Sequence, residues 1–85
     1  MYELVILPGA RRDLERLDPP VRRRIAGRLD WVAEHFDEVQ PEALTGDYAG
    51  WFKIRVGDYR ILYQFDRAAH NLTIVKIRHR REVYE

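Results

Sequence analysis

With 85 residues, 46% of them hydrophobic, the chain can fold around one hydrophobic core, so the sequence predicts a single domain over residues 1–85. It has no cysteine and no apolar run of the roughly 20 residues that span a membrane, which excludes disulfide frameworks, thiolate zinc sites and a transmembrane helix, and favours the cytoplasm. The net charge is only +1, but residues 51–85 carry +4 against −3 for residues 1–50, and 13 of the 15 basic residues are arginine, which favours an anionic polymer as the partner.

The first half of the chain has the pattern of a strand followed by two helices. Residues 2–7 are apolar with β-branched residues in the middle, and Pro8-Gly9 ends them, so they predict a strand. A first helix follows up to Asp18, where Pro19-Pro20 must break it and can begin a second helix. Each helix has one apolar side, formed by Ala10, Leu14 and Leu17 in the first and by Val21, Ile25, Leu29, Val32 and Phe36 in the second.

The second half of the chain has the pattern of a long loop and three strands. Residues 37–50 lose the helical spacing among proline and glycine residues, which is typical of a loop. Strands are predicted at residues 51–56, 59–66 and 72–79. The sequence therefore predicts a small α+β fold with an N-terminal strand, a helical hairpin and a three-stranded antiparallel meander, in the order β-α-α-β-β-β.

A two-residue turn determines how the first two strands of the meander face each other. Gly57-Asp58 fits a type II′ turn, which pairs Arg55 with Arg60. One face is then apolar and suited to cover by the helices, and it consists of Phe52, Ile54, Val56, Tyr59, Ile61, Tyr63 and Phe65. The other face collects Lys53, Arg55 and Arg60, with no acid opposite them in this hairpin. Because directly opposed like charges destabilise a sheet, the three cations favour a role in binding an anion.

The last strand and the residues after it add further basic groups. Val75 and Ile77 alternate with Lys76 and Arg78, so the two cations are expected on the open face of the sheet. They are followed by His79, Arg80, Arg81 and Tyr84. Lys76 and Arg78 also fit ordinary solvent-facing strand positions, and Tyr84 also fits packing on the core.

The sequence lacks the parts of several other kinds of active site. His35, His70 and His79 lie in three different predicted elements, and no pair of them has the spacing of metal ligands. The glycines at 46 and 50 come without a Walker lysine or a GxGxxG pattern. We therefore expect neither a metal nor a cofactor.

The segment LTGDYAGWFKIRVGDYRILYQFD, followed by a strand and HRREVY, resembles the RelE/ParE toxin superfamily over essentially the whole chain. The resemblance implies a RelE-like fold and the function of a toxin in a type II toxin–antitoxin system. In the ribonuclease branch, such toxins enter the ribosomal A site and cleave mRNA by attack of a ribose 2′-OH on the adjacent phosphate, which inhibits translation. The implied partners are the ribosome, mRNA and a cognate antitoxin. The antitoxin is expected to be an acidic, partly disordered chain that wraps the helices and covers the cations or displaces the C-terminal segment.

The resemblance also implies roles for particular residues. The expected catalytic residues are Lys53, Arg60, Arg80 and Tyr84, and the expected RNA-binding residues are Arg55, Lys76, Arg78, His79 and Arg81. Arg60 and Arg80 would hold the scissile phosphate, while Lys53 and Arg55 would position the RNA backbone. Tyr84 would stack on a base or exchange a proton.

Three assignments stay open at this point. Arg55 stands where a second lysine is common in the superfamily. His79 is suited to general acid or base catalysis near neutral pH, but it equally fits the simple end of a strand. A small gap in the alignment across HRREVY leaves Arg81 as an alternative to Arg80 for the phosphate ligand.

Two other functions are compatible with the same sequence. The ParE branch poisons DNA gyrase on the same fold, and a fold alone does not decide an activity. An inactive toxin would bind an antitoxin or nucleic acid without cutting it. The combination of the basic residues with Arg80 and Tyr84 favours the ribonuclease, because a gyrase poison does not need this set.

Overall fold

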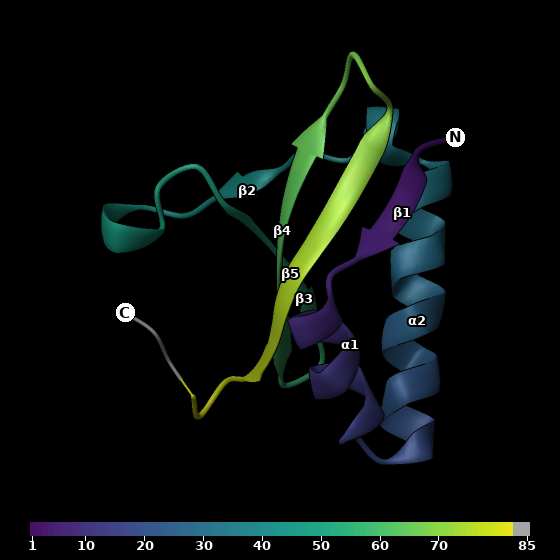
Figure 1. Cartoon of the computed structure of the whole chain (residues 1–85), viewed down its shortest axis with the longest axis vertical. Helices are drawn as coiled ribbons and strands as arrows, with labels where there is room; N and C mark the ends of the chain where they lie inside the picture. The colour runs from purple at the N-terminus through teal and green to yellow at the C-terminus, as the bar shows by residue number, and fades with distance from the viewer. Residues whose placement is uncertain (83–85) are drawn as a thin grey trace.

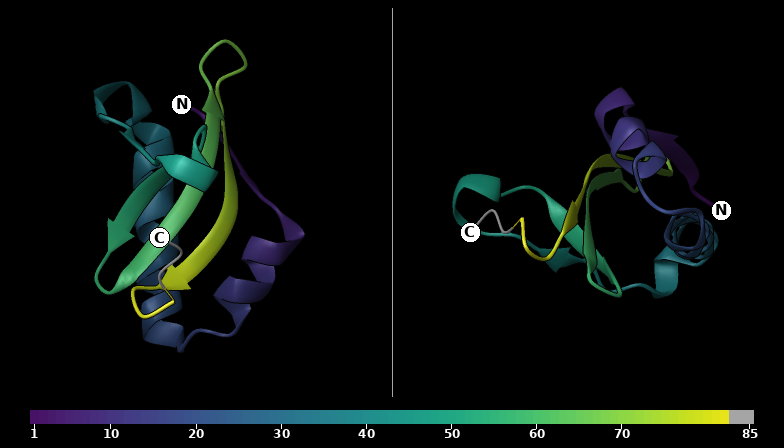
Figure 2. Two further views of the ribbon diagram at one scale, coloured as in Figure 1. Left: turned by 90° about the vertical axis from the view of Figure 1, so that its left-hand side faces the viewer. Right: turned by 90° about the horizontal axis from the view of Figure 1, so that it is seen from below.

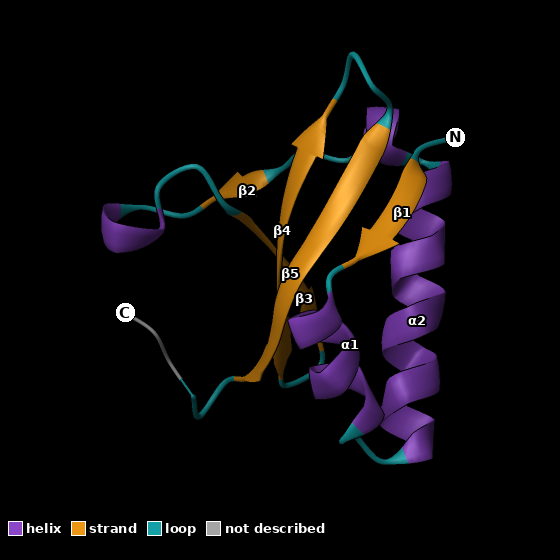
Figure 3. Ribbon diagram, viewed as in Figure 1, coloured by secondary structure: helices purple, strands orange, loops and turns teal. Residues whose placement is uncertain are grey.

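The computed structural model describes residues 1–82, and its helices and strands follow the predicted order (Figures 1 and 3). The chain begins with strand β1 at Glu3–Ile6, helix α1 at Pro8–Glu15 and helix α2 at Pro19–Glu34. The meander consists of β3 at Phe52–Val56, β4 at Tyr59–Asp66 and β5 at Asn71–His79. The predicted α+β fold is therefore confirmed.

The segment between α2 and β3 is more structured than the sequence predicts. It contains the short 3-10 helices η1 at Phe36–Glu38 and η2 at Gly46–Tyr48, with the two-residue strand β2 at Glu42–Ala43 between them. The prediction of a plain loop is wrong here, because β2 is held by pairing with β3 rather than by any pattern of its own.

The five strands form one sheet in the order β1-β5-β4-β3-β2. Strands β3, β4 and β5 pair antiparallel, whereas β1 runs parallel to β5 and pairs Glu3 with Asn71. Both helices lie on one side of the sheet, and the loop with η2 extends on the other side (Figure 2). In the described part of the chain, one face of the sheet is thus left without helical cover. No helix within residues 1–82 has the length and apolar character needed to cross a bilayer.

The hydrophobic core lies between the helices and the covered face of the sheet. Ile25, Leu29 and Val32 of α2 are each at most 1% exposed, which confirms the predicted apolar side of this helix. The predicted apolar face of β3 and β4 also belongs to the core or packs against it. Phe36 is 1% exposed as well, but it lies beyond the end of α2, in η1.

A bulge in β5 changes the predicted alternation of its side chains. Leu62 pairs with Lys76 and Tyr63 with Ile74, so Val75 is left without a partner in the register. Ile74 and Ile77 are both in the core, whereas Val75 is only half-buried. The prediction that Val75 shares the apolar face with Ile77 is therefore wrong, because a bulge inserts one residue that the regular alternation does not contain.

Tyr63 is a buried tyrosine with an unpaired hydroxyl group. It is 0% exposed, and its hydroxyl has no hydrogen-bond partner among the described residues. Burial raises the pKa of Tyr63 from its ordinary value of 10 to about 12; Arg67 acts in the opposite direction and Glu42 in the same direction. The folded protein therefore holds this proton more tightly than the unfolded chain.

We expect the wild-type protein to lose stability at alkaline pH because of Tyr63, and we expect Tyr63→Phe to prevent this loss. Because the folded-state pKa lies above the unfolded one, the contribution of Tyr63 is fully present below pH 10 and is lost as the pH rises towards 12. Relative to that of the wild type, the free energy of unfolding of the variant should therefore rise by about 1.4 kcal/mol per pH unit in this range. Urea titrations of both proteins at about pH 8 and about pH 11 measure it, and a difference that does not change with pH would contradict the expectation.

Candidate nucleic-acid interface

The uncovered face of the sheet carries basic side chains in register across three strands. Arg55 on β3 pairs with Arg60 on β4, and Arg60 pairs with Arg78 on β5. The neighbouring row runs from Lys53 through Leu62 to Lys76. We call Lys53, Arg55, Arg60 and Lys76 the basic face. The predicted register and the opposed pair Arg55 and Arg60 are thereby confirmed.

The turn between β3 and β4 has the geometry that this register needs. Gly57 has a φ of +57°, and Asp58 is not among the residues with positive φ, as a type II′ turn requires. A residue with a side chain is disfavoured at the position of Gly57. The turn therefore fixes which residues of β3 and β4 share the basic face.

The cations of the basic face form no ion pairs within the described residues. The three ion pairs found in residues 1–82 involve Arg67, Arg78 and Arg80 instead. One acid does lie nearby, because β2 places Glu42 opposite Lys53. Within the β3–β4 hairpin, Lys53 faces Leu62 and Arg55 faces Arg60, so the expectation that this hairpin places no acid opposite the cations is confirmed. Glu42 is an additional neighbour on the other side of Lys53 that the sequence does not predict.

The basic face is packed, although no helix within residues 1–82 covers it. Leu62, between Lys53 and Lys76 in the register, is only 1% exposed. Lys53 and Lys76 flank Leu62 in the register, and lysine stems are able to cover apolar surface while their ammonium groups stay in water. The Nζ of Lys76 also lies 5.7 Å from the centroid of the Trp51 ring, in a cation–π contact. Lys76 is thus positioned by Trp51 before any ligand arrives.

Arg60 and Arg80 line one small pocket at the end of the basic face. The pocket has a volume of about 130 Å³ and is lined by Arg55, Gly57, Asp58, Tyr59, Arg60 and Arg80. The backbone N–H of Arg80 donates to the carbonyl oxygen of Asp58 over 2.7 Å, which fixes where Arg80 begins. Its guanidinium lies 3.8 Å from the Asp58 carboxylate, and both side chains are more than 60% exposed, so this ion pair is weak. Arg80 can exchange Asp58 for a phosphate at little cost.

A tight turn after β5 holds Arg80 and Arg81 in place. The backbone N–H of His79 donates to Oε1 of Glu82 over 3.0 Å, and the N–H of Glu82 donates back to the carbonyl of His79 over 2.8 Å. The N–H of Arg81 donates to Nδ1 of His79 over 3.1 Å. Arg81 is exposed but does not line the pocket that contains Arg60. Of the two alternatives in the sequence, the structure brings Arg80 to Arg60.

His79 lies on the face of the sheet opposite to Arg60. It pairs with Tyr59, and the two rings meet edge to face with centroids 5.1 Å apart. Its Nδ1 accepts a hydrogen bond from the backbone, so that nitrogen carries no proton in this arrangement. His79 therefore caps the turn after β5. Its predicted contact with RNA stays a prediction.

Arg78 is in register with the basic face, but its side chain is engaged by α1. Its Nη1 lies 2.7 Å from Oδ2 of Asp13, which also accepts the backbone N–H of Ile77 over 3.1 Å. The same Nη1 donates to the carbonyl of Ile77 over 3.0 Å. Sequence patterns missed Asp13, because 65 residues separate it from Arg78 and no local motif connects them. The Arg78 side chain is thus less available to a ligand on the basic face than its strand position suggests.

The contacts described above test neither the predicted role of Tyr84 nor the expectation that no metal is bound. Tyr84, an expected catalytic residue, lies outside the described residues. Within residues 1–82, no three His, Asp or Glu side chains lie close enough together to hold a metal ion.

Comparison with known proteins identifies the family. A family model described as the ParE toxin of the type II toxin–antitoxin system parDE matches residues 4–84. This chain belongs to the RelE/ParE superfamily of type II toxins. The toxin is 32% identical to Toxin RelG of Mycobacterium tuberculosis over 89 residues, which cover 98% of the chain and 95% of that relative.

Solved structures share the fold of the toxin. The RelBE2 toxin–antitoxin complex from Mycobacterium tuberculosis matches with a TM-score of 0.83 and 27% identity, over 92% of this chain and 90% of that one. The isolated E. coli RelE toxin matches with a TM-score of 0.75 and 21% identity, over 93% and 84%. The YoeB/ParE toxin from Agrobacterium tumefaciens matches with a TM-score of 0.72 and 23% identity, over 91% and 96%. The predicted RelE-like architecture is confirmed.

Proposed function

We propose that this toxin is a ribosome-dependent endoribonuclease, which acts as a single domain in the cytoplasm and cleaves mRNA in the ribosomal A site. The observation that carries the proposal is the pocket that Arg60 and Arg80 line together, next to Arg55. Two guanidinium groups on one small pocket suit a phosphate, because each can donate two parallel hydrogen bonds to its oxygens.

In the proposed reaction, a ribose 2′-oxygen forms a bond to the adjacent phosphorus while the bond from phosphorus to the 5′-oxygen breaks. The 2′-hydroxyl gives up its proton and the 5′-oxygen takes one up, which leaves a 2′,3′-cyclic phosphate and a 5′-hydroxyl end. Arg60 and Arg80 stabilise the negative charge that grows on the phosphate oxygens. Lys53, Arg55 and Lys76 hold the neighbouring backbone. Neither a metal nor a cofactor takes part in this scheme.

The groups that move the protons belong to the proposal as well. Tyr84 is proposed to stack on a base or to exchange a proton with the ribose. An unperturbed tyrosine has a pKa near 10, so proton transfer at neutral pH requires nearby cations that lower it. Arg80 and Arg81 precede Tyr84 in the chain and are suited to this.

We also propose that a cognate antitoxin holds the toxin inactive. The similar RelBE2 structure is a toxin–antitoxin complex, and so is the RelE–RelB structure from Pyrococcus horikoshii. An acidic segment that covers Arg55, Arg60 and Lys76 would block RNA binding directly. Folding of such a segment on the toxin would supply the binding surface that a disordered chain lacks on its own.

Inhibition of DNA gyrase is the second candidate, because the matching family model carries the description ParE toxin. The superfamily uses one fold for both activities, so this description alone does not decide between them. The alternative differs in its prediction: the toxin would then stop DNA supercoiling and leave mRNA intact.

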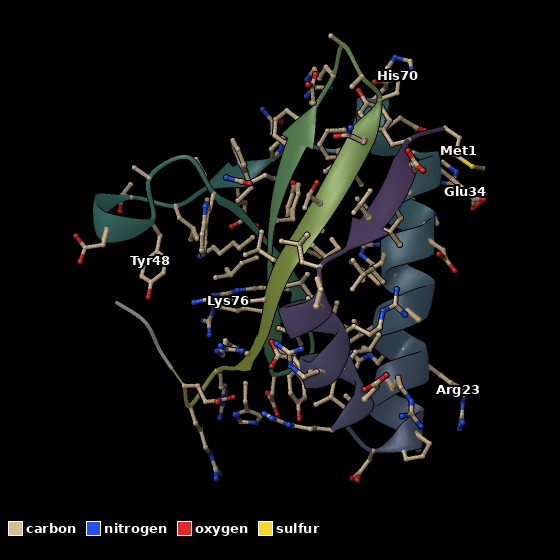
Figure 4. All side chains as sticks on the ribbon, viewed as in Figure 1. Met1, Arg23, Glu34, Tyr48, His70 and Lys76 are labelled. Carbon is tan, nitrogen blue, oxygen red and sulfur yellow. The ribbon has the colours of Figure 1, made fainter. Side chains whose placement is uncertain are left out.

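The test is a translation reaction with a defined messenger, run with and without ribosomes, in which primer extension maps new RNA 5′ ends. We expect cuts within codons that require ribosomes, vanish with Arg60→Ala and persist with Arg23→Ala. Arg23 is a matched control because its side chain points away from the sheet (Figure 4). Continued translation without cuts by the wild-type toxin would contradict the proposal, and a gyrase supercoiling and cleavage assay would then test the alternative.

A further inference from the structure

We propose that a second RNA-binding surface leads from the basic face around the β3–β4 turn onto α2. We call its side chains, Arg24, Arg28 and Arg55, the arginine band. The occupant is the phosphate backbone of RNA that extends beyond the cleavage pocket. The inference rests on the proposed function in one respect, namely that RNA is the polymer bound on the basic face.

The arginine band is continuous with the pocket that contains Arg60 and Arg80. A second, open pocket on the other side of β3 shares Arg55 and Gly57 with it. This second pocket is lined by Arg24, Gly27, Arg28, Trp31, Arg55, Val56 and Gly57. Strand β2 pairs only with Phe52 and Lys53, so within the described residues no strand covers the rest of this edge. One RNA strand can therefore pass from one pocket to the other.

Arg24 lies directly against the turn between β3 and β4. A Cβ atom added to Gly57 would lie only 2.9 Å from Nη1 of Arg24. Gly57 gives the turn its positive φ, and the Arg24 guanidinium lies in the space beside it. The charge of Arg24 thus lies at the point where a strand leaving the Arg60 pocket would cross the turn.

Arg28 is held by an aromatic ladder along α2. Its Cζ lies 4.8 Å from the ring centroid of Trp31, and Trp31 stacks on His35 with centroids 4.5 Å apart and planes inclined by 20°. Trp31 is 42% exposed, which is unusual for so large an apolar side chain. A guanidinium held against a ring keeps its N–H groups free for a phosphate and loses less freedom on binding. Arg28 is therefore ordered for a ligand that the described residues do not supply.

The charges favour a polyanion that follows the band. Arg24, Arg28 and Arg55 take part in none of the ion pairs found in residues 1–82. The next hollow beyond Trp31 is mixed in charge, because Glu38 and Glu42 line it together with Arg28, Lys53 and Arg55. The cations are without acidic neighbours only on the near side of Trp31, so we place the end of the band there. RNA is favoured over an acidic protein because the same strand would already be fixed by the pocket next to Arg55.

The test measures how binding depends on salt, without ribosomes and without cleavage. The probes are fluorescent 2′-O-methyl RNAs of about 4 and about 16 nucleotides, the range of site sizes for single strands. They lack the attacking hydroxyl and cannot be cut. The band variant Arg24→Gln/Arg28→Gln is compared with Arg11→Gln/Arg23→Gln, which loses the same charge from exposed helix positions. Circular dichroism and thermal unfolding confirm first that both variants are folded.

The measured quantity is the slope of the logarithm of the binding constant against the logarithm of the salt concentration. For the long RNA, we expect the band variant to lower the magnitude of this salt slope by about 1.4, or about 0.7 for each lost phosphate contact. The short RNA should bind the band variant and the wild type alike, and the control variant should keep the wild-type slope with both RNAs. Equal slopes for the two variants on the long RNA, or no binding of long RNA by the wild type, would overturn the proposal.

A glutamate-rich peptide serves as the third probe. If the band variant loses affinity for this peptide but not for the long RNA, the surface belongs to an acidic protein and the RNA assignment is wrong. The proposed function is judged separately, because ribosome-dependent cuts are scored in another assay. If the toxin makes ribosome-dependent cuts but the two variants have equal salt slopes on the long RNA, only the arginine band is rejected. If the band variant changes the slope but the wild-type toxin makes no cuts, only the nuclease is rejected.

Discussion

Phe36→Ala is expected to lower the free energy of unfolding by about 3–5 kcal/mol, the usual cost of emptying a buried aromatic site. The Phe36 ring lies 4.9 Å from both Tyr2 and Phe65 and meets Tyr63 edge to face at 6.2 Å, all between ring centroids. The guanidinium of Arg67 covers it at 5.1 Å. Small domains have only about 5–15 kcal/mol in total, so the variant should approach the limit of folding.

Urea denaturation followed by tryptophan fluorescence measures the loss. Phe36→Leu is the matched control, because it keeps most of the apolar volume and should cost about 1–1.5 kcal/mol. A loss below about 1 kcal/mol for Phe36→Ala would show that the aromatic cluster collapses around the gap or contributes little to stability.

Asp13→Ala is expected to lower the free energy of unfolding by about 2–3 kcal/mol, since hydrogen bonds to a charged group are among the stronger ones. Oδ2 of Asp13 accepts both the backbone N–H of Ile77 and Nη1 of Arg78, and the Asp13 side chain is only 18% exposed. The variant leaves both donors without this partner. It also releases Arg78 from α1, so the row of Arg55 and Arg60 gains a third free cation.

Two measurements separate the parts of this effect. Asp13→Asn keeps an acceptor for Ile77 but loses the charge, so it should recover part of the stability. Hydrogen exchange at the Ile77 amide should become faster in Asp13→Ala, because that amide loses its acceptor. Unchanged exchange together with an unchanged urea midpoint would mean that Asp13 does not stabilise β5.

The parts of the fold that the sequence predicts are those set by neighbours along the chain. The register between Arg55 and Arg60 follows from Gly57-Asp58 alone, because a two-residue turn leaves one way to pair the strands. The apolar side of α2 likewise follows from spacing within one helix. These local features already place three cations of the basic face together.

Features that depend on residues far apart in the chain could not be predicted from such local patterns. The bulge at Val75 fits β5 to β4 and has no signal of its own in the alternation. Asp13 meets Arg78 only because α1 packs against β5. Arg80 comes close to Arg60 through a hydrogen bond to the backbone of Asp58, which the spacing in HRREVY does not encode. Tertiary contacts complete the pocket that local patterns only outline.

The parallel pairing of β1 with β5 has a consequence for the order in which the pocket can form. Glu3 meets Asn71 and Ile6 meets Ile74, so the first of the five strands in the chain pairs with the fifth. Such distant pairing is slow to form, and it is impossible until β5 has left the ribosome. Arg80 follows β5 directly and lines the pocket with Arg60 of β4. A chain in which β5 has not yet joined the sheet therefore lacks the assembled pocket.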